Sequence, residues 1–130
     1  MPSRKHGANI MNNTTLSSKK CTPCQGGIAP MTIELAQSHL NDVQGWELLD
    51  KASKLKRTFK FNNFEYAMQF ALYVGQLCED ERHHADLGIG WGYCRVEFQT
   101  HKINGLHEND FIMAAKVNGL AESNGKILSK

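Results

Sequence analysis

The sequence lacks any long run of apolar residues, and this excludes one class of protein at once. A membrane-spanning helix needs about 20 consecutive, mostly apolar residues, so we expect no membrane partner. The N-terminal stretch also lacks the apolar core of a secretory signal, and its single arginine, Arg4, is too few for a transit peptide. These absences together predict a cytoplasmic protein.

Residues 1–20 contain no acidic side chain and almost no apolar one. A segment so rich in Asn, Ser, Thr and Lys cannot bury enough surface to offset its ordering entropy, which predicts a disordered basic tail. Its four basic residues give a local charge of +4, whereas residues 21–130 hold 11 basic and 13 acidic residues. We therefore expect one domain over residues 21–130 without direct nucleic-acid binding, because phosphate binding requires a basic face on the folded part.

Cysteine is scarce, with Cys21, Cys24, Cys78 and Cys94 as its only positions. Without an export signal, disulfides are not expected. Cys21 and Cys24 form a C-x-x-C pair, but a zinc site lacks two further ligands at close spacing, and the Gln25–Gly27 stretch opens no helix for a redox dithiol. We favour a structural thiol pair in an arm leading into the fold, with Cys78 and Cys94 in the core.

Apolar residues alternate with polar ones in four short segments, and they recur every three or four residues in three longer ones. The first pattern is typical of half-buried strands and the second of amphipathic helices. The order α-β-β-α-β-β-α predicts a two-layer α+β domain, in which a four-stranded antiparallel sheet carries three helices on one face. The expected helices cover residues 33–40, 64–80 and 107–119, the last ending at Gly119, and the expected strands cover 45–49, 55–61, 87–91 and 94–100.

Two groups of titratable residues stand at the ends of these elements: Glu79 with the pair His83-His84, and His101 with Asp110 nine residues later. Histidine titrates near neutral pH and is the natural acid or base for proton transfer. The same residues also have ordinary structural interpretations: an exposed and inert histidine pair, a polar strand end and a helix-capping carboxylate.

A metal site is the other chemical interpretation, since histidines with Asp or Glu can bind zinc or a first-row metal. However, His83 and His84 are adjacent, so their side chains would point to opposite sides of an extended segment. No H-x-H or H-x-x-x-H spacing occurs in the sequence. We therefore expect no metal.

At these residues the sequence resembles the pterin-4a-carbinolamine dehydratases, over about Cys21 to Leu120. The spacings of 17 residues from His84 to His101 and of 9 from His101 to Asp110 are similar to those of the family. The matching motifs are Gly45-Trp46, Phe59-Lys60-Phe61-Asn62-Asn63-Phe64, Glu79-x-x-x-His83-His84, Tyr93 to Thr100-His101, and Asn104 to Phe111.

The resemblance implies a hydro-lyase that acts without a cofactor. Its substrate would be 4a-hydroxytetrahydropterin, left by aromatic amino-acid hydroxylases, and its product the quinonoid dihydropterin. It implies His83, His84 and His101 as the catalytic residues, with Asp110 and Glu79 in supporting or substrate-binding positions. It also implies a homodimer or homotetramer. The alternative is a non-catalytic interaction module on the same fold, either a transcriptional dimerisation cofactor or an assembly factor.

Two positions depart from the family pattern. Ala85 follows the histidine pair where the family usually has proline, which would hold His84 out of the helical region. His107 stands where the family often has Ser or Thr as a helix cap. We interpret His107 as a weak cap rather than a neighbour of the site.

Overall fold

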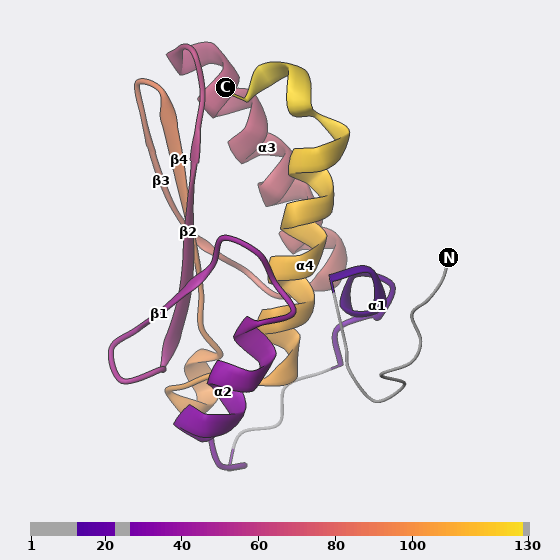
Figure 1. Ribbon diagram of the computed structural model, residues 1–130, viewed down its shortest axis with the longest axis vertical. Coiled ribbons are helices and arrows are strands. Elements are labelled where there is room, and N and C mark those ends of the chain that lie inside the picture. The colour runs from indigo at the N-terminus through magenta and orange to yellow at the C-terminus, as the bar shows by residue number, and fades with distance from the viewer. Residues whose placement is uncertain (1–12, 23–26, 129–130) are drawn as a thin grey trace.

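The computed structural model describes residues 13–22 and 27–128. A single antiparallel sheet with the strand order β1-β2-β4-β3 forms one layer, and helices cover one of its faces (Figure 1). The predicted α+β architecture is confirmed, and the predicted order α-β-β-α-β-β-α holds from α2 to α4, with the unpredicted helix α1 before it. The strands are β1 (Glu47–Leu49), β2 (Lys54–Lys60), β3 (Asp86–Gly90) and β4 (Tyr93–Phe98), and the helices are α1 (Asn13–Ser17), α2 (Ile33–Leu40), α3 (Phe64–Glu81) and α4 (Glu108–Ser123).

The strand register explains why one face of the sheet is apolar. Leu55 pairs with Phe98 and Phe59 with Cys94 across β2 and β4. Because successive side chains point to opposite faces, these apolar residues share the face toward the helices, and all four are buried. Residues in between, such as Lys56 and Glu97, lie on the opposite face.

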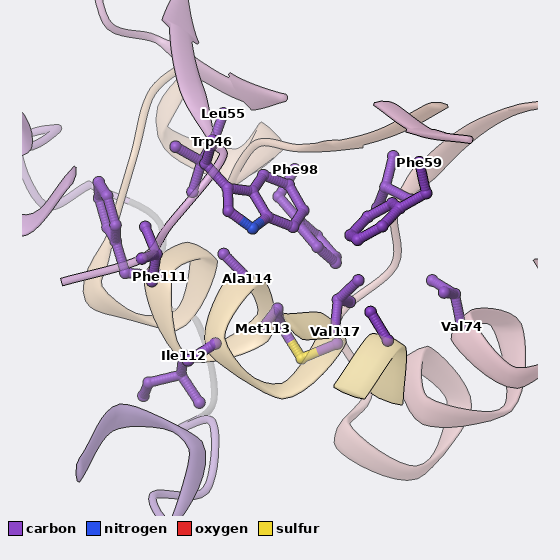
Figure 2. Packing of buried hydrophobic residues seen from close by; sticks show 14 of the residues in the cluster. Trp46, Leu55, Phe59, Val74, Phe98, Phe111, Ile112, Met113, Ala114 and Val117 are labelled. Atoms are coloured by element: carbon purple, nitrogen blue, oxygen red, sulfur yellow. The ribbon is translucent and has the colours of Figure 1, made fainter. Parts of the chain in front are cut away.

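The core lies between this face and α4. Figure 2 shows Trp46, Phe59 and Phe98 packed against side chains of α4, with Val74 of α3 at one side. A helix that is apolar on most sides must be enclosed, and α4 is buried continuously from Asn109 to Ala115. The sheet covers one side of α4, and α1 packs on the side away from the sheet (Figure 1).

Helix caps fix the starts of the elements that lead to the site. Thr32 Oγ1 accepts a hydrogen bond from the Leu35 N–H at 3.2 Å, and Asn63 Oδ1 accepts one from the Tyr66 N–H at 2.8 Å. Each satisfies a backbone donor that the first turn of the helix leaves unpaired. Threonine and asparagine are among the residue types favoured at this position.

Two expectations about the ends of the chain are wrong. The predicted disorder does not extend to residue 20, because α1 is a helix and Leu16 is fully buried against α4. Residues 1–12 lie outside the described residues. At the other end, α4 continues past Gly119 to Ser123, and a 3-10 turn, η2 (Gly125–Ile127), follows it. In the described residues no helix is long and apolar enough to cross a membrane.

Candidate active site

The C-terminus of α3 places the histidine pair. Arg82 adopts the left-handed conformation (φ 56°, ψ 38°), and the His83 N–H donates to the Cys78 carbonyl at 3.1 Å. This is the pattern of a Schellman cap, which turns the chain sharply out of the helix. His83 and His84 therefore lie at the helix-to-strand junction that the sequence predicts, and the chain leaves the helix although Ala85 replaces proline.

Asp110 lies in the first turn of α4, where it faces His83, and its side chain is fully buried. Its Oδ2 accepts hydrogen bonds from Thr100 Oγ1 at 2.7 Å and from the His107 N–H at 3.0 Å. Its Oδ1 lies 2.7 Å from His83 Nε2. The carboxylate is thus held by three groups and in turn fixes the orientation of His83.

His83 is further restrained by its ring contacts. Its imidazole stacks on Phe98 of β4, with the ring centroids 6.1 Å apart and an interplanar angle of 25°. The side chain is only 11% exposed. Because His83 Nε2 contacts Asp110, the other ring nitrogen, Nδ1, is the one that can form a hydrogen bond with a ligand.

His84 is far more open. Its Nε2 lies 2.5 Å from Glu79 Oε2, and the two side chains are 63% and 70% exposed. Adjacent histidines thus face different carboxylates, as expected for neighbours in an extended segment. Glu79 lies in the last turn of α3, two residues before its end, and contacts His84 from that position.

His101 does not end a strand, contrary to the sequence-based expectation. β4 stops at Phe98, and His101 opens a 3-10 turn, η1 (His101–Ile103). Thr100 and Gly105 pair in an isolated bridge that closes this loop. The bridge sets the position of η1, and the His101 side chain is exposed there.

The three histidines line one open concavity of about 350 Å³. It lies between the junction after α3 and the loop after β4, and Asp110 lies behind His83 rather than in its wall. Arg82 and Lys102 give it a basic rim, with Asp86 as an acidic neighbour. A volume of this order suits a small bicyclic ligand. The lining residues are Arg82, His83, His84, Ala85, Asp86, Gln99, Thr100, His101 and Lys102.

His107 caps α4, as the sequence predicts. Its Nδ1 accepts a hydrogen bond from the Asn109 N–H at 3.0 Å, and with Asp110 it forms a capping box at the start of α4. Sequence reasoning missed Thr100 and Arg82. Thr100 is buried, and no local sequence pattern predicts its contact with Asp110. Arg82 adopts a left-handed backbone conformation that is more typical of glycine.

The described cysteines do not contribute to this site. Cys78 and Cys94 are buried in the core, as predicted, and Cys21 is half-buried in the arm before the fold. Burial raises the pKa of Cys21 to about 12 and that of Cys94 to about 11, which disfavours the nucleophilic thiolate. Cys24 lies outside the described residues. Within the described ranges, no three His, Cys, Asp or Glu side chains form a group that could hold a metal.

Sequence comparison decides the family. The profile of the family described as pterin 4 alpha carbinolamine dehydratase matches residues 29–120, which include the whole concavity and Asp110.

The chain belongs to the pterin-4a-carbinolamine dehydratase family.

Relatives and a solved structure agree with this membership. A Methylococcus capsulatus protein named "putative pterin-4-alpha-carbinolamine dehydratase" is 68% identical over 111 residues, covering 85% of this chain and 97% of its own. An Azoarcus protein with the same name is 47% identical over 111 residues, covering 85% and 95%. The crystal structure of a transcriptional coactivator/pterin dehydratase from Brucella melitensis superposes with a TM-score of 0.66 at 29% identity, covering 71% of this chain and 98% of that one. The predicted family and fold are therefore confirmed.

Proposed function

We propose that this chain is a pterin-4a-carbinolamine dehydratase that uses histidine acid–base catalysis. The observation that carries the proposal is the gathering of His83, His84 and His101 around one concavity, with His83 fixed by the buried carboxylate of Asp110. Family membership and the names of the relatives support the substrate class, a 4a-hydroxytetrahydropterin.

The reaction requires two proton transfers. The C4a–O bond breaks as the departing hydroxyl takes up a proton and leaves as water. The adjacent ring nitrogen loses its proton, and its electron pair forms the new double bond to C4a, which gives the quinonoid dihydropterin. One group must therefore donate a proton and another accept one, at neighbouring atoms of a flat ring. Histidines suit both roles near neutral pH.

The open positions of His84 and His101 suit the residues that exchange protons. His84 can exchange a proton with Glu79, whose carboxylate contacts its Nε2. His83 is held by Asp110 and Phe98, so it presents Nδ1 in a fixed direction and either binds the pterin or shares the acid role. Because elimination in this class of compound proceeds without a catalyst, acid–base help of about 10²–10⁴-fold is sufficient.

Replacement of the two open histidines tests the assignment. We expect His84→Ala and His101→Ala each to lower the dehydration rate at least about tenfold in a stopped-flow assay, equivalent to roughly 1.4 kcal/mol of barrier. His39→Ala is the matched control, since His39 pairs with Asp42 outside the concavity. Wild-type rates in both site variants would refute the catalytic roles.

A protein-interaction role is the second candidate, because the Brucella melitensis neighbour is titled a coactivator as well as a dehydratase. A pull-down beside the kinetic assay separates the two. Stable capture of one partner by a wild-type chain with no dehydratase rate would favour the interaction role.

A further inference from the structure

The N-terminal strap, which we define as residues 13–22, lies outside the segment matched by the family profile. It is nevertheless attached to α4. Leu16 is fully buried there, the Lys116 ammonium donates to the Ser17 carbonyl at 2.8 Å, and Lys19 pairs with Glu108 at 2.9 Å. The strap is therefore a bound part of the fold.

Two side chains hold the end of the strap. Asn109 binds the backbone of Thr22 at two points: its Oδ1 accepts from the Thr22 N–H at 3.0 Å, and its Nδ2 donates to the Thr22 carbonyl at 2.7 Å. Glu81 Oε1 accepts from the Cys21 N–H at 3.0 Å, and Lys116 lies 3.7 Å from Glu81 Oε2. Burial acts to raise the pKa of Glu81, but the Cys21 N–H and Lys116 outweigh it, so this pKa lies below its usual value.

These two side chains are next to the residues of the site. Glu81 is the last residue of α3, two positions before His83, and Asn109 immediately precedes Asp110. The strap thus joins the C-terminus of α3 to the N-terminus of α4. These are the two ends whose separation sets the contact of 2.7 Å between His83 Nε2 and Asp110 Oδ1.

We propose that the strap positions the His83–Asp110 pair, with Glu81 and Asn109 as the positioning residues through which it acts. The inference rests on the proposed function only for its kinetic consequence. Hydrogen bonds from one short backbone segment to both helix ends restrict their relative movement. Misplacement of a catalytic group by about 1 Å can lower a rate about 100-fold, so even a partial loss of this restraint should be measurable.

The kinetic test uses variants of the full chain. We expect Glu81→Ala and Asn109→Ala each to lower kcat about fivefold to twentyfold with little change in KM. Glu81→Gln keeps an oxygen for the Cys21 N–H and should restore most of the rate. The matched control is Asn63→Ala, which also removes an asparagine oxygen from a backbone N–H, but at the opposite end of α3.

A second readout needs no substrate. In 15N-labelled protein, the His83 Nε2 resonance reports its hydrogen bond to Asp110. It should shift in Glu81→Ala and Asn109→Ala, and stay at its wild-type position in Glu81→Gln and Asn63→Ala. Should one variant fail to fold, the other gives the same comparison. An inactive wild-type chain would refute the proposed function, while the resonance still decides the positioning role.

Three results would overturn the positioning role. They are an unchanged His83 resonance in both alanine variants, an equal change in Asn63→Ala, and a Glu81→Gln variant as impaired as Glu81→Ala.

Discussion

The carboxylate of Asp110 accepts from Thr100, from the His107 backbone and from His83. The His107 N–H can only donate, so an asparagine at this position must keep its oxygen there and turn its NH₂ group toward His83. His83 Nε2 would then have to accept, which moves the imidazole proton to Nδ1. The substitution therefore reverses the tautomer that the carboxylate selects.

We expect Asp110→Asn to lower kcat about 10- to 100-fold while costing only about 1 kcal/mol of stability. Steady-state kinetics and urea denaturation measure the two effects, and imidazole 15N shifts show which nitrogen of His83 carries the proton. A variant with the wild-type tautomer and a normal rate would show that Asp110 only caps α4.

Cys94 is fully buried on β4, and burial raises its pKa from 9.0 to about 11. Between these values the unfolded chain loses the thiol proton while the folded chain keeps it. The unfolded state then binds fewer protons, so the free energy of unfolding falls as pH rises, by about 1.4 kcal/mol per pH unit. Below about pH 9 this stabilising contribution is fully present.

Cys94→Ala removes this titration. We expect the variant to be less stable than the wild type near neutral pH, because a buried side chain is lost. Between about pH 9 and about pH 11, however, its stability should fall by about 3 kcal/mol less than that of the wild type. Urea denaturation across this range checks the difference between the two slopes. Parallel slopes would contradict the raised pKa of Cys94.

At the scale of the elements, periodicity and caps were sufficient to predict most of the fold. Alternation between Leu55 and Phe61 predicts β2, and Asn63 marks the start of α3, because these signals depend on residues near each other in the sequence. The position of Asp110 in the first turn of α4 is predictable for the same reason.

The remaining features of the site depend on distant contacts. His101 opens η1 because Thr100 pairs with Gly105, and Thr100 is buried because it meets Asp110 across the loop. Arg82 adopts a left-handed backbone conformation that an arginine in the sequence does not predict. The sequence alone therefore singles out the histidines and Asp110, and the resemblance to a family implies their roles, whereas the contacts that orient them depend on the fold.

The helix α1 also depends on contacts that local sequence patterns do not predict. A helix of five residues cannot form alone, because nucleation costs more than its few hydrogen bonds return. Its stability comes from Leu16 on α4, and one apolar residue in a polar stretch gives no periodicity to detect. Composition therefore predicts disorder where tertiary contacts produce order.

Gly119 lies in the interior of α4 rather than at its end, and a Cβ added there meets no atom within 4 Å. Gly119→Ala should therefore stabilise the protein by roughly 0.5–1 kcal/mol, because alanine loses less backbone entropy on folding. Urea denaturation measures the gain. Gly92→Ala is the contrasting control, since φ of +81° and the Phe61 carbonyl 3.2 Å from a Cβ predict destabilisation. A loss of stability in Gly119→Ala would contradict the expectation.

At the scale of the whole molecule, an apolar surface remains on the β3 side of the sheet. Exposed Phe64, Met68 and Leu72 recur every four residues along α3 and so share one face of the helix. Beside them lie Leu87 and Ile89 of β3, an edge strand. Together these five residues form what we call the α3–β3 face, which contains an apolar groove of about 390 Å³. Exposed edges and apolar patches of this kind are usually covered by another chain.

We therefore predict that the protein is a homodimer or homotetramer assembled through the α3–β3 face. Leu72 is 69% exposed, so Leu72→Glu should leave the fold intact while placing a charge where the partner must exclude water. Light scattering after size-exclusion chromatography should show a smaller species for this variant than for the wild type.

Leu35→Glu is the matched control, because Leu35 is also exposed, at 48%, but belongs to α2. A monomeric wild type would refute the assembly, and dissociation by Leu35→Glu instead would move the interface to α2. Glu79 lines the groove and also contacts His84, so assembly on this face would bring the partner subunit close to the Glu79 carboxylate.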